Sequence, residues 1–176
     1  MRKKNLFLSL LLLLSLASGS CNRISKKNEN KEVILASFTV LADIIRNVAK
    51  DEFIVRSLTK PGVEVHGYQP TPSDLVNASS AFVFVDNGFG FELWAEKFVS
   101  NLKVKRITVA EDLDPIFISE DFYNGKPNPH AWISPKRGML YVDILVDSLS
   151  ELRPSKRTLF EENGKIYKNK LYKIDK

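Results

Sequence analysis

The sequence predicts an α/β fold with a four-stranded, mainly parallel sheet flanked by helices. Short apolar runs rich in β-branched and aromatic residues recur along the chain, and segments with helical periodicity follow them. The connections between these segments are mostly short. Alternation of this kind is typical of βαβ units, which place parallel strands side by side in one sheet.

The first strand and the first helix are predicted directly after one another. EVILASFTV, residues 32–40, is a short apolar run and predicts a buried strand. In residues 41–51 the apolar side chains then fall on one face of a helix. They are Leu41, Ile44, Ile45 and Val48. Residues 53–59 form the next apolar run and predict the second strand.

The same order is repeated further along the chain. Thr71, Pro72 and Asp74 predict a helix start, with a threonine cap, a proline in the first helical position and an acidic residue near the positive end of the helix dipole. Strands are predicted at residues 81–86 and 106–110, with a glycine turn and a helix between them. The last strand is short, and we place it near an edge of the sheet.

The C-terminal part of the sequence is predicted to be helical. A long irregular stretch follows the last strand and runs up to His130. Ser134 and Pro135 then predict the cap and start of a helix that reaches about Leu152. The Arg-Pro pair that follows ends this helix and starts a last, highly charged one.

The N-terminus has the features of an export signal. The charged MRKK precedes the apolar run NLFLSLLLLLSLA, which is too short to span a bilayer comfortably, and small residues then lead to Cys21. We predict a lipoprotein signal peptide over residues 1–20 and lipidation of Cys21. Ser18 stands where a lipobox usually has an aliphatic residue, so ordinary cleavage or an uncleaved anchor is the alternative. Residues 21–31 are polar and predict a flexible tether.

Charge and cysteine content exclude some classes of function. Three of the 26 basic residues belong to the predicted signal, which leaves 23 against 21 acidic residues. No basic block with interleaved aromatic residues is present, so no nucleic-acid partner is expected. Cys21 is the only cysteine, and an intramolecular disulfide is therefore excluded.

The two histidines of the chain, His66 and His130, share a local design. Each lies in a proline-flanked loop that leads into a helix started by proline. Proline restricts the backbone that carries the imidazole, so less entropy is lost when a ligand binds. Neutral imidazole is a common ligand of first-row divalent metal ions. The pattern therefore favours a metal site over two surface histidines without a role, although two donors are fewer than a complete site needs.

The position of His66 in the predicted fold supports a ligand site. It lies just past the second strand, and parallel sheets gather ligands outside the carboxyl ends of their strands. Neither histidine has an obvious nucleophile partner, and the chain has no phosphate-binding glycine loop, so no enzyme activity is predicted. Trp94 and Trp132 are interpreted as packing residues. Four aspartates are interpreted as caps, strand ends or solvated helix faces: Asp43, Asp74, Asp86 and Asp143.

Five segments of the chain carry a resemblance to a known family. They are ASFTVLADIIRNV, LTKPGVEVHGYQPTPSD, NGFGFELW, GKPNPHAWISP and YVDILVDSLSEL. Together they resemble the metal-binding receptors of bacterial ABC importers for manganese, iron and zinc, the cluster A-I solute-binding lipoproteins. The resemblance runs from about Val33 to the end of the chain. It implies two α/β lobes joined by a long rigid helix, with the ion bound between the lobes.

The resemblance also implies ligands. His66 matches the histidine of a P-H-x-Y-E/Q-P-T-P motif, and His130 matches the histidine of an N/D-P-H-x-W motif. Val65 and Gln69 replace the proline and glutamate that many members have, and neither position supplies a ligand. The third and fourth ligands of the family, a Glu or His and then an Asp, lie in its second lobe.

The resemblance implies a domain organisation as well. Residues 32–153 match the N-terminal metal-binding lobe, and residues 154–176 match the start of the interlobe helix. No second lobe follows in this sequence, so we expect a truncated chain.

The function implied by the resemblance is capture of an ion outside the cytoplasmic membrane and its delivery to an ABC permease. The implied protein is a monomer, lipid-anchored in the periplasm or at the outer face of that membrane. The two histidine loops look most like the manganese/iron branch, so Mn²⁺ or Fe²⁺ is expected, with Zn²⁺ as the alternative because the same donors bind it. A surface adhesin or interaction lipoprotein with vestigial metal binding is an open alternative. A metal-dependent hydrolase is least favoured, because no candidate general base lies beside the histidines.

Overall fold

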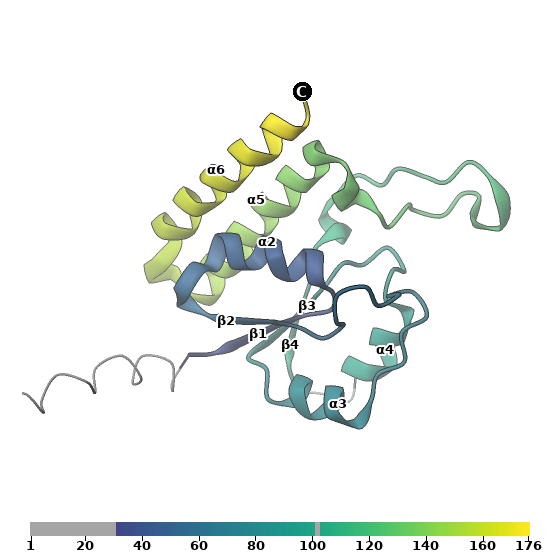
Figure 1. The fold of residues 1–176 in the computed structure, drawn as a ribbon, viewed down its shortest axis with the longest axis horizontal. Coiled ribbons are helices and arrows are strands. Elements are labelled where there is room, and N and C mark those ends of the chain that lie inside the picture. The colour runs from purple at the N-terminus through teal and green to yellow at the C-terminus, as the bar shows by residue number, and fades with distance from the viewer. Residues whose placement is uncertain (1–30, 101–102) are drawn as a thin grey trace, which may run out of the picture. The chain divides into compact units, whose positions relative to one another are not determined.

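Four parallel strands form one sheet at the centre of the fold (Figure 1). In the computed structural model, residues 31–100 and 103–176 are described; the predicted signal peptide, Cys21 and nearly all of the predicted tether lie outside them. The strands occur in the order β2-β1-β3-β4, and every adjacent pair is parallel. They are β1 (Val33–Ala36), β2 (Ile54–Ser57), β3 (Val83–Asp86) and β4 (Lys105–Thr108). The predicted fold class and the edge position of the last strand are confirmed.

Helices cover both faces of this sheet (Figure 1). One face carries α2 (Thr39–Ala49), α5 (Pro135–Leu152) and α6 (Arg157–Ile174), and the other carries α3 (Pro72–Ser79) and α4 (Leu93–Val99). Single turns of 3₁₀-helix occur between them: Lys50–Glu52, Ala110–Asp112, Asp121–Tyr123, Ala131–Ile133 and Pro154–Lys156. In the part of the chain that the structure describes, none of the helices combines the length and apolar character that a bilayer span requires.

The core follows from the alternation of side chains along the strands. Ile34 and Ala36 of β1 pack with the helices of the first face, whereas Leu35 packs with those of the second. The first face holds the larger core, because the buried stripe of α2 lies there. All four residues of that predicted stripe are buried: Leu41, Ile44, Ile45 and Val48. Residues Glu32–Lys176 accordingly form one compact unit.

The end of the first strand differs from the prediction. Residues 32–40 read as one apolar strand, but β1 ends at Ala36 and α2 begins at Thr39. Phe38 is the extended N-cap, and its carbonyl accepts the N–H of Ala42 at 3.0 Å. Thr39 and Val40 are β-branched and fit the pattern of a strand, so apolar character alone does not separate the strand from the first helical turn.

The two predicted helix starts behave differently. At α3 the capping box is present: Thr71 Oγ1 accepts the N–H of Asp74, and the Asp74 carboxylate accepts the N–H of Thr71 at 2.7 Å. The helix predicted after Ser134 is also found, with the predicted end at Leu152. However, the Ser134 side chain makes no capping bond, so that part of the prediction is wrong. Pro135 still fits the first helical position, because its fixed φ suits a helix and no intrahelical bond needs its missing N–H.

Residues 114–129, between β4 and α5, form an arm that projects from the rest of the domain (Figure 1, green). An isolated antiparallel bridge pairs Phe117 with Pro127, and the N–H of Ile118 donates to the carbonyl of Lys126 at 2.9 Å. The sequence predicted an irregular stretch here. The arm returns to the carboxyl edge of the sheet and ends immediately before the second histidine.

Candidate metal centre

Both histidines lie on loops at the carboxyl edge of the sheet. His66 follows β2, and His130 follows the arm and precedes α5. Their Nε2 atoms are 3.1 Å apart, and their ring centroids are 5.1 Å apart. The two residues are 64 positions apart in the sequence, so the parallel topology brings them together. The structure thus places side by side the two residues that the sequence singled out.

The distance between the two nitrogens suits shared coordination of one ion. With metal–nitrogen bonds of about 2.1 Å, two ligand nitrogens that subtend about 90–110° at the ion are about 3.0–3.4 Å apart. The separation of 3.1 Å between the Nε2 atoms falls in that range. The same separation also allows one N–H···N hydrogen bond between the rings, which a bound ion would replace.

His130 is held in one orientation by Asn128. The Asn128 side-chain oxygen accepts the backbone N–H of His130 at 3.0 Å and lies 3.1 Å from Nδ1 of its ring. Because an amide oxygen only accepts, the Nδ1 atom carries the proton, and Nε2 keeps its lone pair for a ligand. Burial and the neighbouring His66 lower the pKa of His130, which further favours the neutral, ligating form.

The loop that carries His66 is fixed on both sides of that residue. The Glu64 carboxylate accepts the N–H groups of His66 at 2.7 Å and of Gly67 at 2.6 Å. These bonds from Gly67 and His66 lower the pKa of Glu64. The indole N–H of Trp94 donates to the carbonyl of Val65 at 2.9 Å. The His66 backbone is therefore restrained although its side chain is exposed.

A cluster of aromatic side chains packs against the two imidazoles. The ring of Phe91 contacts both, with centroid distances of 4.5 Å to His66 and 5.6 Å to His130. The ring centroid of Trp132 lies 5.3 Å from that of His130 and 4.7 Å from that of Phe91. Phe38 packs against the rings of Phe91 and Trp132. This apolar layer limits water access to the imidazoles from the side of the core. The interpretation of Trp94 and Trp132 as packing residues is confirmed.

A cleft of about 590 Å³ opens over the histidines. One wall comes from the glycine turn before α4, and the other from the arm. Its lining residues are His66, Phe89, Gly90, Phe91, Leu93, Ile118, Tyr123, Lys126, Pro127, Pro129 and His130. The two rings thus face a space large enough to admit an ion with its bound water.

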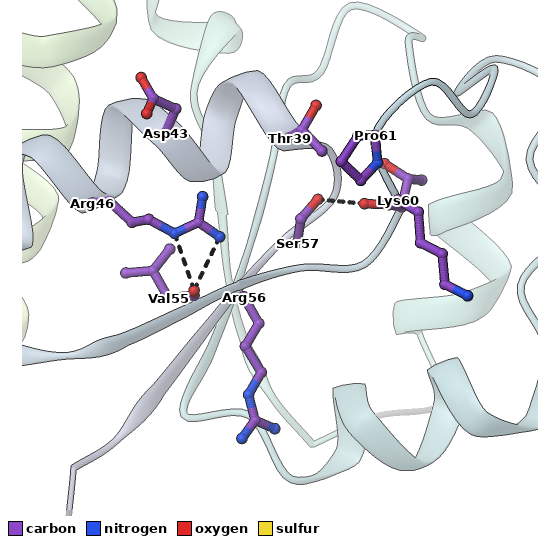
Figure 2. Close-up of a pocket in the computed structure, with 9 residues that line it drawn as sticks. Thr39, Asp43, Arg46, Val55, Arg56, Ser57, Lys60 and Pro61 are labelled. Atoms are coloured by element: carbon purple, nitrogen blue, oxygen red, sulfur yellow. Dashed lines mark hydrogen bonds between the residues drawn. The ribbon is translucent and has the colours of Figure 1, made fainter. Parts of the chain in front are cut away.

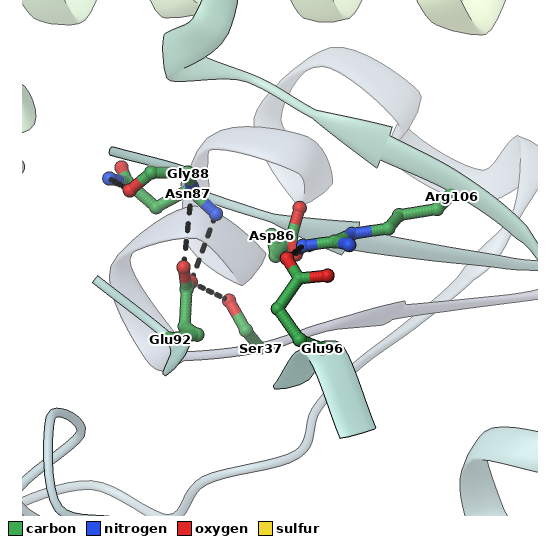
Figure 3. A network of polar contacts seen from close by, with 7 residues as sticks. All are labelled: Ser37, Asp86, Asn87, Gly88, Glu92, Glu96 and Arg106. Atoms are coloured by element: carbon green, nitrogen blue, oxygen red, sulfur yellow. Dashed lines mark hydrogen bonds and ion pairs between the residues drawn. The ribbon is translucent and has the colours of Figure 1, made fainter. Parts of the chain in front are cut away.

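A buried carboxylate, Glu92, lies at the ends of the central strands (Figure 3). It accepts the hydroxyl of Ser37 at 2.6 Å and the backbone N–H groups of Asn87 at 2.9 Å and Gly88 at 3.3 Å. Burial raises the pKa of Glu92 to about 7 in spite of these bonds. The sequence reasoning did not identify Glu92. The signal that could have found it is a lone carboxylate within the apolar run FGFELW.

The four aspartates occupy structural positions, as predicted. Asp86 ends β3 and is paired with Arg106, which also reaches Glu96 (Figure 3). Asp74 belongs to the cap of α3, and the helix residues Asp43 and Asp143 bind Tyr167 and Lys168. In residues 31–100 and 103–176, no group of three or more His, Cys, Asp or Glu side chains could hold one ion together. Among the described residues, the candidate donors are therefore the two imidazoles.

A second hollow, of about 610 Å³, lies beside α2 and β2 (Figure 2). The guanidinium of Arg46 donates to the carbonyl of Val55 at 3.2 and 3.3 Å, and the Ser57 hydroxyl donates to the carbonyl of Thr59 at 2.7 Å. Arg56 extends to the other side of the strand (Figure 2). Arg46 and Ser57 are thus engaged within the protein, and among the described residues that line this hollow no pair of metal-ligating side chains converges, so the histidine cleft is the better candidate site.

Comparison with known proteins places the chain in a family. Residues 34–176 match the sequence profile of the family described as "Zinc-uptake complex component A periplasmic" (ZnuA). The chain belongs to this family. Among ZnuA-family relatives, the iron-binding protein YfeA of Yersinia pestis is 36% identical over 170 residues, which are 96% of this chain and 53% of YfeA. The manganese ABC transporter substrate-binding lipoprotein PsaA of Streptococcus anginosus is 33% identical over 179 residues, 97% of this chain and 57% of PsaA.

A solved ZnuA-like structure agrees with the fold. The Mn-bound periplasmic metal binding protein from Candidatus Liberibacter asiaticus superposes with a TM-score of 0.73 at 37% identity. The match covers 80% of this chain and 53% of that one. The chain thus spans about half the length of these relatives.

Glutamine at position 92 is expected to change how stability depends on pH. Because the pKa of Glu92 in the folded state, about 7, exceeds its ordinary value of 4.5, the folded protein holds the proton more tightly. The free energy of unfolding should therefore fall by roughly 3 kcal/mol as the pH rises through the window from about 4.5 to about 7. Glu92→Gln should remove this pH-dependent contribution. Urea unfolding of both proteins across pH 4 to pH 8, roughly the window of that shift, measures the difference.

Glu96→Gln is the control for this measurement. The carboxyl of Glu96 is exposed, and its bond to Arg106 lowers its pKa. Its contribution should therefore change only at lower pH. Parallel stability curves for wild type and Glu92→Gln would contradict the assignment of a raised pKa to Glu92.

Proposed function

We propose that residues 32–153 are the N-terminal metal-binding lobe of the substrate-binding component of an ABC-type importer for divalent metal ions. The 3.1 Å approach of the Nε2 atoms of His66 and His130 carries this proposal. Membership in the ZnuA family supports it, as do relatives named as iron-binding and manganese-transporter proteins. The protein captures an ion outside the cytoplasmic membrane and delivers it to the permease, and no covalent bond is made or broken.

Capture depends on two preset imidazoles. Asn128 holds the proton of His130 on Nδ1, so Nε2 faces the neighbouring ring with its lone pair free. The lowered pKa of His130 favours its neutral ring, so Nε2 of this residue needs to lose no proton before the ion binds. The remaining ligands would come from carboxylates of a second lobe, in the part of the relatives that this chain does not match, and from water.

Mn²⁺ or Fe²⁺ is the proposed ion, with Zn²⁺ as the alternative. Relatives named for iron and for manganese support the first choice, and the zinc-uptake description of the family supports the second. Two imidazoles with added carboxylates suit all three ions, and Zn²⁺ binds such donors more tightly than Mn²⁺ or Fe²⁺. Selection would therefore depend on the coordination geometry that the complete site imposes.

We also propose a location and a route to the permease. Residues 1–20 would act as a lipoprotein signal peptide, and Cys21 would carry the lipid anchor at the outer face of the cytoplasmic membrane or in the periplasm. Residues 21–31 would be the tether, and residues 154–176 would begin the interlobe helix of a monomeric protein. Relatives named substrate-binding lipoproteins of ABC transporters support this arrangement.

Metal titration of residues 22–176 tests the proposed function. We expect weak binding of Zn²⁺ and Mn²⁺ by calorimetry, and its loss in the double variant His66→Ala, His130→Ala, because both donors are removed. Asp143→Ala, on the outer face of α5, is the control and should bind as wild type does. Unchanged binding in the double histidine variant would reject the proposal.

A second candidate function is an interaction module at the cell surface. The arm favours it, because it exposes several large apolar side chains: Ile116, Phe117, Phe122 and Tyr123. Specific binding to a host matrix that is lost when Phe122 and Tyr123 are replaced by serine would support this candidate. Matrix binding that is absent, or equal in both proteins, would remove it.

A further inference from the structure

Asn87 is a fully buried polar residue directly after β3, and each of its polar groups has a partner (Figure 3). Its backbone N–H donates to Glu92 at 2.9 Å, and its carbonyl accepts the N–H of Ala110 at 2.7 Å. Its side-chain oxygen accepts the hydroxyl of Tyr141 at 2.5 Å. A buried side chain satisfied in this way has one stable orientation.

The amide nitrogen of Asn87 reaches the loop of the second histidine. It donates to the carbonyl of Pro129 at 2.9 Å and to that of Gly88 at 3.0 Å. The Pro129 carbonyl and the His130 N–H belong to the same planar peptide unit. Because Asn128 accepts that N–H at 3.0 Å, the unit is held from both sides. The backbone from which the His130 ring projects is thereby fixed.

The other side of Asn87 is anchored in the framework of the fold. Glu92, which holds its N–H, also accepts the hydroxyl of Ser37 at the end of β1. Tyr141, which holds its side-chain oxygen, is fully buried in α5. The chain of bonds thus runs from two central strands and one helix to the peptide of His130.

We propose that Asn87 is a positioning residue for His130, which sets the separation of the two imidazoles by clamping the Pro129–His130 peptide to the sheet. This inference deepens the proposed function. Its expected effect on metal affinity rests on that function. Residues that orient a ligand from the next layer typically change metal affinity by about 10- to 100-fold when they are removed. Asn87 would act through the backbone of the ligand rather than through its ring.

Asn163 offers a matched control for a residue that serves only the core. It is also buried, and its amide nitrogen donates to a backbone carbonyl, that of Val48, at 2.9 Å. Val48 lies in the last turn of α2, whereas the edge with the histidines lies at the first turn of this helix. Leucine at either position removes the same kind of bond and keeps the number and branching of the side-chain heavy atoms.

The experiment compares Asn87→Leu, Asn163→Leu and wild type by NMR, first without metal. Cross-relaxation between the His66 and His130 rings reports their contact, and it should be lost in Asn87→Leu and kept in Asn163→Leu. Zn²⁺ titration is then followed at the ring nitrogens of each histidine. The Zn²⁺ affinity of Asn87→Leu should be weaker by about tenfold or more, and that of Asn163→Leu should equal that of wild type. If Asn87→Leu does not fold, Tyr141→Phe removes one bond to Asn87 and should reduce both the ring contact and the Zn²⁺ affinity.

The outcomes separate the inference from the function beneath it. If the ring contact is retained in Asn87→Leu, the positioning role is overturned, and the same holds for Tyr141→Phe where it replaces that variant. Equal loss of the ring contact in Asn87→Leu and Asn163→Leu also overturns it. If Zn²⁺ shifts neither histidine in wild type, the proposed function fails, and the ring contact measured without metal still decides the role of Asn87.

Discussion

Replacement of Arg106 by methionine is expected to destabilise the fold by about 3–5 kcal/mol, since the Asp86 carboxylate is then buried without its partner. Asp86 is fully buried, and the guanidinium of Arg106 binds one of its oxygens through Nε at 2.8 Å and Nη2 at 2.5 Å. Burial already raises the pKa of Asp86 although Arg106 opposes this. Urea unfolding at about pH 7.5, where a carboxyl in the unfolded chain is fully ionised, measures the loss in the free energy of unfolding.

Two further variants test the cause of this loss. The double variant Asp86→Asn, Arg106→Met removes the buried charge with its partner and should recover much of the stability. Glu96→Gln removes the other partner of Arg106, but its side chain is 64% exposed, so at most about 1 kcal/mol is expected. Equal losses in the single Arg106 variant and in the double variant would show that the buried charge is not the reason.

Alanine at position 160 is expected to cost about 3–5 kcal/mol in the free energy of unfolding. Phe160 of α6 is fully buried and belongs to the core on the α2 and α5 face of the sheet. Its ring stacks on that of Phe53 with centroids 6.3 Å apart. Thermal or urea unfolding of the variant measures the cost of the cavity.

Ile166→Ala is the control on the same helix. Ile166 is 56% exposed, so its replacement should change stability by less than about 0.5 kcal/mol. The contrast tests whether α6 is an integral part of this domain. In the structure α6 packs closely on α5, since a Cβ added at Gly164 would lie 2.6 Å from the Val146 side chain. A small effect at both positions would contradict this packing and mean that α6 is detached in solution.

Local and periodic features made most of the fold predictable. The buried stripe of α2 is a helical repeat, and the capping box of α3 is a local motif, so neither depends on distant residues. The start of α2 was misplaced because Thr39 and Val40 suit a strand as well as a helix. Ser134 is the N-cap residue of α5, as predicted, but its capping bond is absent, because a serine before a proline does not determine where the hydroxyl points.

The candidate site was predictable only in its two ligands. His66 and His130 stand out because their loops are alike and the topology brings the loops to one edge. Their supporting residues are distant in sequence: Asn87 lies 42 positions from Pro129, and Glu92 lies 55 positions from Ser37. Such pairs depend on the tertiary arrangement, and no repeat or spacing in the sequence predicts them. Whether an ion binds both imidazoles stays a prediction until it is measured.

The two tryptophans of the chain flank the two histidine loops, Trp94 through the Val65 carbonyl and Trp132 through ring contact with His130. Indole emission should therefore respond to a quenching ion in the cleft, without any attached dye. A paramagnetic cation seated between the imidazoles would quench that emission, whereas a closed-shell one would not. Under the proposed function, the two indoles would provide an optical way to tell manganese or iron from zinc.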